Sequence, residues 1–453
     1  MTTADEPAPR TWLGRLVQIR PGEGASIAWA TALFFLLLCA NFTLRPVREA
    51  LGIERGADDL PLVWTGTLTL SLLVQPVFAT LLARTRRRTF VPLVYGIGIA
   101  FLLAFRAAFE FAPAGWKLGI GYAFYVWFSV FNVFSLSVFW GFAADLFRLE
   151  QAQRLFAFVS VGGTVGALCG STLAKELARP FGTVNLIFVG CGLLVLATGC
   201  VVALVRLHPE DAPREPSAAA ATGAADPRSA WRGLAFIARS PYLQGICAFT
   251  LFHTLFGTVL YFQQANLVSA ALTERNERTA YFATVDQIAN ALTLFLQLFV
   301  TGRLIQRLGT GFALVTQPLV AGAACLGLGG MILYGTAAFG DGWTHAWPPS
   351  LVAVAAARVL LSAANYATAK PARESLFTVV PKAAKYASKS FVDTFVYRAG
   401  DLIGAWTFDL FAKTLGVALG TIALGAAPLA LVWLGVGVAL GRRQRDLSGG
   451  GPG

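Results

Sequence analysis

Long apolar runs separated by short polar segments make up most of this chain. Most runs are about 18 to 26 residues long, close to the roughly 20 residues that a helix needs to cross a hydrocarbon core about 30 Å thick. Backbone groups in lipid must be hydrogen-bonded within the chain, so spans of this length are expected to be helices. The pattern predicts twelve spans, centred near residues 33, 72, 99, 130, 166, 195, 255, 290, 325, 360, 402 and 428.

Polar side chains within the spans recur on one helical face of every third span. The spans near residues 99, 195, 325 and 428 carry few of them. The residues expected to bind a substrate on the polar faces are Asn41, Arg45, Arg48, Tyr122, Tyr125, Asn132, Tyr261, Gln264, Arg358 and Asn365, with Lys370 and Arg373 just past the tenth span. This rhythm resembles the major facilitator superfamily, in which the first helix of each three-helix unit lines a central cavity. The resemblance implies an all-α polytopic membrane protein with twelve helices in two six-helix halves.

One long polar stretch divides the spans into two sets. Residues 207–232 are rich in Pro, Ala and charge and follow the sixth predicted span, which is typical of a linker. We therefore expect an N-terminal segment (1–24), an N-terminal half (25–206), a linker (207–240), a C-terminal half (241–441) and a tail (442–453).

Composition and charge agree with a membrane protein. Hydrophobic residues make up 56% of the chain and charged residues only 13%, against about 25% charged in soluble domains. Cationic loops are retained in the cytoplasm, and about two thirds of the Lys and Arg residues fall on the side that holds both termini. We expect a multi-pass protein of the cell inner membrane, surrounded by lipid, with both termini cytoplasmic. This bias explains the net charge of +12 without nucleic acid.

The sequence carries no pattern for catalysis or for a bound cofactor. All six cysteines fall within predicted spans, where they act as small apolar residues, so neither a disulfide nor a metal site is expected. There is no Walker motif, no HExxH and no catalytic triad pattern. We therefore expect no enzyme and no cofactor.

A short charged cluster occurs twice, each time at the end of an apolar run. "TLRPVREALG" (43–52) follows the first run, and "ATAKPARESLF" (367–377) follows the tenth. Because these two spans are expected to run in opposite directions, Glu49 and Glu374 should lie near opposite mouths of one cavity. Either the clusters gate the cavity, or they are interfacial charges that snorkel to water and the repetition is chance.

Three motifs carry a closer family resemblance. "NFTLRPVREAL" (41–51), residues 138–158 with Phe139 to Ala143, and "KPARESLFTVVPKAAKYASKSFVDTFVYRAGD" (370–401) are similar to the non-mitochondrial ATP/ADP translocases of intracellular bacteria and plastids. The resemblance implies transport of nucleotides by exchange. The chain departs from the family pattern at Val63, where a lysine usually precedes the tryptophan, at Asp401, where another lysine is usual, and at Arg48-Glu49, where Lys-Asp is usual. Fewer cations favour a substrate with less charge than a triphosphate.

Further polar residues are candidates for coupling or gating. Asp286 and Asn290 lie on one helical face, where a carboxylate is either a proton site or half of an ion pair that locks two helices. Asp393 and Asp401 share a face in the eleventh span, and Arg398 is placed to pair with Asp401. His253 is expected to serve packing more than proton transfer.

The glycines at 162, 166 and 170 form a GxxxGxxxG face, which predicts close packing of two helices.

Three functions are compatible with these patterns. The leading hypothesis is a secondary transporter that moves an organic anion, such as a nucleotide or nucleotide-like metabolite, as a monomer with a small-molecule anionic substrate as its partner. The second is a proton-coupled exporter of a non-nucleotide amphipathic compound, with Asp286 as the proton site. The third is a membrane sensor or scaffold without transport.

Overall fold

The computed structural model describes residues 23–84, 87–147, 149–208, 227–339 and 347–449. The predicted N-terminal segment and linker therefore lie largely outside the described residues. Within them every regular element is helical, as expected. The helices of the first part of the chain are α2 Gly24–Gly52, α3 Leu60–Arg84, α4 Arg87–Phe111, α5 Lys117–Leu146, α6 Leu149–Phe181 and α7 Leu186–Leu207. Those of the second part are α9 Pro227–Arg239, α10 Pro241–Ala271, α11 Arg275–Leu296, α12 Gly302–Phe339, α13 Pro349–Ala364, α14 Lys370–Leu376, α15 Lys382–Phe391, α16 Tyr397–Asp409 and α17 Leu419–Gly449.

Nine helices among the described residues are long and apolar enough to cross a membrane. The predicted spans near residues 72, 166 and 402 are not among them, so the count of twelve is not confirmed. The apolar part of α3 is the shorter segment Leu60–Gln75. Polar and small side chains lower the mean hydropathy of α6. α16 is only 13 residues long and carries Arg398, Asp401 and Asp409.

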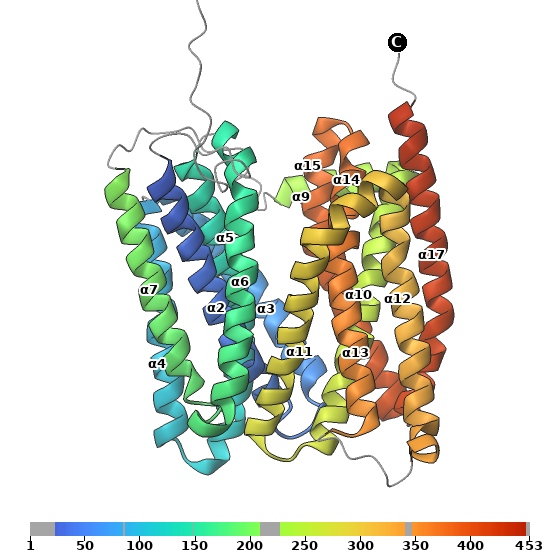
Figure 1. Cartoon of the computed structure of the whole chain (residues 1–453), viewed down its shortest axis with the longest axis horizontal. Coiled ribbons are helices and arrows are strands. Elements are labelled where there is room, and N and C mark those ends of the chain that lie inside the picture. The colour runs from blue at the N-terminus through green and yellow to red at the C-terminus, as the bar shows by residue number, and fades with distance from the viewer. Residues whose placement is uncertain (1–22, 85–86, 148, 209–226, 340–346, 450–453) are drawn as a thin grey trace, which may run out of the picture.

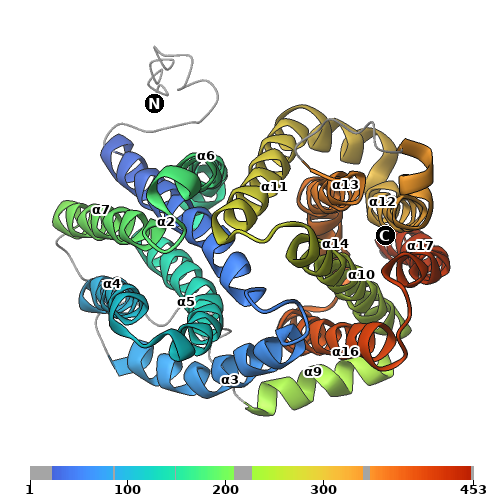
Figure 2. The same cartoon turned by 90° about the horizontal axis from the view of Figure 1, so that it is seen from below.

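The helices form two groups that stand side by side. α2 to α7 make up the first group and α10 to α17 the second, and α2 meets α11 while α3 meets α16 where the groups adjoin (Figures 1 and 2). α2 ends at one end of the molecule and α14 lies at the other (Figure 1). The two repeated clusters therefore lie near opposite ends, as predicted.

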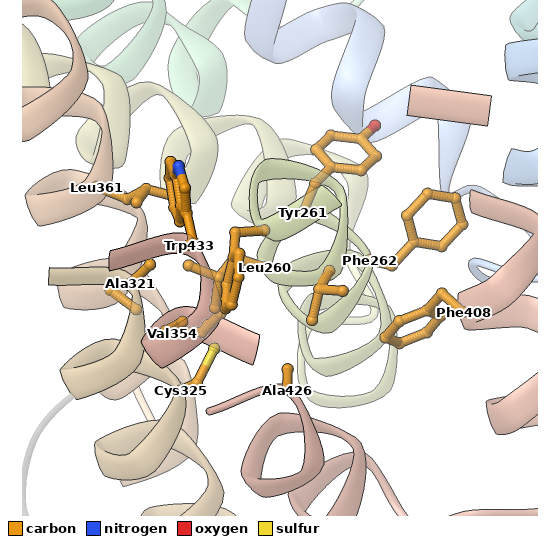
Figure 3. Packing of buried hydrophobic residues seen from close by; sticks show 14 of the residues in the cluster. Leu260, Tyr261, Phe262, Ala321, Cys325, Val354, Leu361, Phe408, Ala426 and Trp433 are labelled. Carbon is orange, nitrogen blue, oxygen red and sulfur yellow. The ribbon is translucent and has the colours of Figure 1, made fainter. Parts of the chain in front are cut away.

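Each group is built around its own apolar core. In the second group Phe262 packs on Phe408, with ring centroids 5.3 Å apart, and Trp433 stacks on Phe256 at 5.4 Å (Figure 3 shows the surrounding cluster). This core continues across the boundary into Ile53 and Ala57, which follow α2 and are 1% and 5% exposed. An apolar contact thus joins the groups at the end of the molecule where α2 ends, which we call the closed end.

The glycine face of α6 packs directly on α2, as predicted. A Cβ atom at Gly166 would lie 2.2 Å from the carbonyl oxygen of Phe35, and one at Gly170 would lie 2.2 Å from that of Cys39. Only the absence of side chains allows the two backbones to come this close. This contact sets the position of α2, whose last three turns carry Arg45, Arg48 and Glu49.

Candidate functional site

A cavity of about 370 Å³ lies between the two helix groups. Its wall comes from α2, α3 and α5 on one side and mainly from α10, α13 and α16 on the other. The predicted substrate-binding residues in the wall are Arg45, Arg48, Tyr125, Asn132, Tyr261, Arg358 and Asn365, and the predicted gating residues there are Glu49, Arg398 and Asp401. Seven of the twelve predicted substrate-binding residues thus line the cavity.

Two predicted binding residues lie beneath the floor of the cavity. Tyr122 is one turn nearer the closed end than Tyr125, and its hydroxyl donates to Asp59 at 2.8 Å. Gln264 lies one turn beyond Tyr261 on α10 and is 3% exposed. Both residues share a helical face with residues of the wall, but they lie one turn nearer the closed end than the cavity extends.

Three other predicted binding residues are also absent from the wall. Asn41 donates its side-chain amide to Asn132 of the neighbouring helix α5, so it orients a wall residue. Lys370 is exposed, with its ammonium 5.5 Å from the centroid of the Tyr366 ring, and Arg373 is buried at 9% exposure. Both follow the π-helical turn Asn365–Ala369 that ends α13, and this turn places them beyond the cavity.

A network of polar and aromatic side chains forms the floor. The Arg48 guanidinium pairs with the adjacent Glu49 carboxylate and lies 4.8 Å from the centroid of the Tyr125 ring. Glu49 also accepts a hydrogen bond of 2.6 Å from the Tyr261 hydroxyl, which is 2.8 Å from the hydroxyl of Tyr125. In Figure 3 the Tyr261 hydroxyl points toward the blue helices of the first group. Glu49 is only 4% exposed, so it is not an interfacial charge that reaches water.

Trp64 completes the floor, although it is not among the predicted binding residues. Its indole N–H donates to the Tyr125 hydroxyl at 2.9 Å, and its ring lies 5.0 Å from that of Tyr261. The predicted binding residues come from the polar faces of every third span, and Trp64 lies in the second span, so that pattern does not include it. A signal was present in the family resemblance, in which a lysine usually precedes this tryptophan.

Asp286 makes an ion pair between the groups. Its carboxylate lies 3.4 Å from the Arg45 guanidinium, with side-chain exposures of 15% and 32%. Asp286 is not itself a wall residue. The side-chain nitrogen of Asn290, one turn further along α11, is buried and has no hydrogen-bond partner among the residues that the structure describes. Of the two interpretations of this face, the contact favours the ion pair.

Arg358 is placed differently from the other cations of the wall. Its guanidinium donates to the Gly257 carbonyl at 3.3 Å and lies 5.7 Å from the centroid of the Tyr261 ring. No carboxylate of the described residues lies within ion-pair distance of it. A guanidinium held this way retains donors that an anionic ligand can use.

The remaining gating candidates lie in the second group. Arg398 and Asp401 both face the cavity, but they form no ion pair of 4 Å or less among the described residues, contrary to expectation. Glu374 pairs with Lys389, and Asp393 is exposed outside the wall. His253 lies in the wall with its Nδ1 2.7 Å from the Gln317 amide nitrogen and its Nε2 3.4 Å from the Tyr397 hydroxyl. His253 is thus held by two partners.

Below the floor, the closed end is fastened by bonds that sequence analysis did not predict. Arg275 makes a bidentate contact with Glu54, at 2.6 and 3.0 Å, and Arg278 donates to the Ile53 carbonyl at 2.8 Å. The Thr183 hydroxyl lies 2.8 Å from that of Thr279. Each bond joins a residue of the first group to one on α11. Sequence offers no sign of which loop charges will meet.

Comparison with known proteins gives consistent results. The family model described as TLC ATP/ADP transporter matches residues 114–440. The ADP,ATP carrier protein 1 of Chlamydia muridarum is 25% identical over 343 residues, which cover 69% of this chain and 63% of that protein. The same carrier of Chlamydia trachomatis is 24% identical over 338 residues. The chain therefore spans less than two thirds of the length of these relatives.

Solved structures of transporters share the fold. The nucleoside transporter NupG has a TM-score of 0.62 at 12% identity, with 92% of this chain and 98% of that chain covered. A peptide transporter of the POT family has a TM-score of 0.61 at 14% identity, covering 92% and 97%. A bacterial homologue of the human lysosomal transporter Spinster has a TM-score of 0.55 at 14% identity, with 95% of this chain and 98% of that chain covered. At these identities the likeness establishes a major facilitator fold.

Proposed function

The chain belongs to the TLC ATP/ADP transporter family, and on that premise we propose that it is a secondary transporter that carries an organic anion of the nucleotide class by alternating access. The family resemblance and the major facilitator fold expected from the sequence are confirmed. The family and the fold are those of membrane transporters, which supports a carrier over an enzyme or a scaffold.

One observation carries the proposal: the wall of the cavity between the groups holds the guanidinium groups of Arg45, Arg48, Arg358 and Arg398 together with aromatic rings. Cations inside a membrane protein are energetically costly, so those that are present are candidates for a functional role. Guanidinium groups bind phosphate and carboxylate oxygens through paired N–H donors. Aromatic side chains beside them supply surfaces for a ring.

The arrangement of bonds between the groups supports an inward-facing state. All the side-chain bonds described above that cross between the groups lie in the cavity floor, behind its wall or at the closed end. If both termini are cytoplasmic, as the positive charges predict, the closed end faces outward. The cavity then exchanges with the cytoplasm, and transport requires these bonds to break.

Several finer points belong to the same proposal. We assign twelve spans, two halves at 25–206 and 241–441, a cytoplasmic linker at 207–240, a location in the inner membrane and a monomer that needs no cofactor. Both termini and the linker should react with impermeant labels only after the membrane is opened. Labelling from the outside would contradict this topology.

Counterflow in proteoliposomes tests the function. The name of the Chlamydia relatives makes ADP and ATP the first compounds to test, followed by other nucleotides and organic anions. Vesicles preloaded with an unlabelled compound should take up the labelled form faster than empty vesicles, and Arg358→Gln should remove at least nine tenths of this uptake. Arg358→Lys keeps the positive charge but loses the paired N–H donors of the planar guanidinium, so this variant should retain part of the uptake. Uptake that follows only a pH gradient, with no effect of preloaded anion, would instead support the proton-coupled exporter.

A further inference from the structure

The charges around the cavity nearly cancel. Arg45, Arg48, Arg358 and Arg398 contribute four positive charges to the wall, and Glu49 and Asp401 contribute two negative charges. Asp286 lies behind the wall and pairs with Arg45, so it belongs in the same sum. The formal charge of the set is therefore +1, and it becomes +2 when one carboxyl takes a proton.

Two of the four cations already have carboxylate partners. Arg48 pairs with Glu49, which is also held by Tyr261, and Arg45 pairs with Asp286. In the described part of the chain Arg358 contacts a carbonyl and an aromatic face but no carboxylate, and Arg398 lies in the wall together with Asp401. An incoming anion therefore finds one cation free of carboxylates and a second that shares its surroundings with one carboxylate.

We propose that the cavity selects a ring-bearing anion with one or two negative charges, of the kind represented by a nucleoside monophosphate, and discriminates against polyphosphates. This inference rests on the proposed function, because it concerns the substrate of the same site. A di- or triphosphate brings further charges that must leave water, and each of them needs a cation or several donors in exchange. The other two cations predicted to bind substrate, Lys370 and Arg373, lie outside the wall.

Asp401 is the residue on which this selectivity depends most directly. It faces the cavity without an ion pair of 4 Å or less among the described residues, so its ionised form repels anionic ligands there. Replacing it with an amide should therefore favour the more highly charged ligand of any pair.

The test measures dissociation constants of purified full-length protein for two ligand series, in EDTA so that Mg²⁺ does not mask phosphate charge. The first is AMP, ADP and ATP, of which AMP carries roughly two charges at pH 7.5 as other phosphate monoesters do. The second is benzoate, phthalate and benzene-1,2,4-tricarboxylate, which add charge to one ring without a nucleotide. We expect ATP to bind at least tenfold more weakly than AMP, and the tricarboxylate more weakly than phthalate.

Asp401→Asn should shift the ATP-to-AMP affinity ratio toward ATP by at least threefold, whereas Asp401→Glu should leave it within twofold of the wild type. Thermal unfolding of both variants establishes that they are folded. ATP binding as tightly as AMP, or an unchanged ratio in Asp401→Asn, would overturn the inference. If the benzene carboxylates bind in the expected order while no nucleotide binds, the inferred selection by ligand charge stands and the proposed nucleotide transport fails. If neither series binds, both fail.

Discussion

The Tyr261 hydroxyl donates a hydrogen bond of 2.6 Å to the Glu49 carboxylate, and this bond joins the second helix group to the first at the floor of the cavity. Tyr261 also meets the Tyr125 hydroxyl at 2.8 Å, so one oxygen from α10 holds two residues of the first group. Both partners must separate when the closed end opens. Under the proposed alternating access, the bond is therefore a contact of one conformation only.

Tyr261→Phe should shift the protein toward opening of the closed end. The ring stays, but a hydrogen bond to a charged group is lost, which is worth about 1.5–3 kcal/mol. A loss of this size changes the ratio of the two conformations about tenfold or more. The reporter is Ala57→Cys, whose parent side chain is 5% exposed at the closed end, labelled with an impermeant thiol reagent.

Tyr242→Phe is the matched control for this variant. Its hydroxyl donates to the Leu376 carbonyl at 2.9 Å, and both residues belong to the second group. Its loss should leave Cys labelling at position 57 unchanged. Equal labelling rates in the two variants would show that the Glu49 bond does not hold the closed end shut.

Reversing the charge of either Glu54 or Arg275 alone should destroy their ion pair, and reversing both charges together should restore it. Each side chain is 32% exposed, so the pair is worth only about 1 kcal/mol. Glu54→Arg should raise labelling at position 57 severalfold, because it places like charges together. Adding Arg275→Glu should return labelling toward the parent rate. A double variant that labels faster than either single variant would rule out this pairing.

Asp286→Asn should lower the thermal stability of the protein. The substitution leaves the Arg45 guanidinium without its carboxylate partner at 3.4 Å. Removal of one partner from a fully buried pair costs about 3–5 kcal/mol, and the 32% exposure of Arg45 reduces this to about 1–3 kcal/mol. Arg45→Gln in the same chain should recover part of the loss. If Asp286→Asn left the midpoint of unfolding unchanged but abolished gradient-driven uptake, Asp286 would be a coupling site.

Gly166→Ala should destabilise the protein, whereas Gly192→Ala should not. A methyl group at position 166 would meet the backbone of Phe35 at 2.2 Å, while the same group at position 192 meets nothing within 4 Å. Alanine in an open helical position is favoured over glycine by about 0.5–1 kcal/mol. The difference in unfolding midpoint between the two variants measures the α2–α6 contact. Similar midpoints would mean that this contact does not set the position of α2.

The sequence predicted the helices and part of the polar wall because both follow from periodicity within a single helix. Arg45 and Arg48 at i and i+3, or Arg358 and Asn365 at i and i+7, share a face wherever the helix packs. Periodicity does not say where along the axis the cavity stops, so Tyr122 and Gln264 were assigned to it although they lie one turn too far. It also cannot pair residues distant in the chain. Glu54 with Arg275, and Thr183 with Thr279, are brought together only by the packing of α11 against the first group.

A cross-link at the closed end tests alternating access most directly. Thr183 and Thr279 are 1% and 0% exposed, and their hydroxyl oxygens lie 2.8 Å apart on different groups. Thr183→Cys with Thr279→Cys should form a disulfide that holds this end shut, with each single variant as control. The oxidised protein is predicted to bind its ligand but to show no counterflow, and reduction should restore exchange to the rate of the single variants. Counterflow that is as fast after complete oxidation as after reduction would contradict the account.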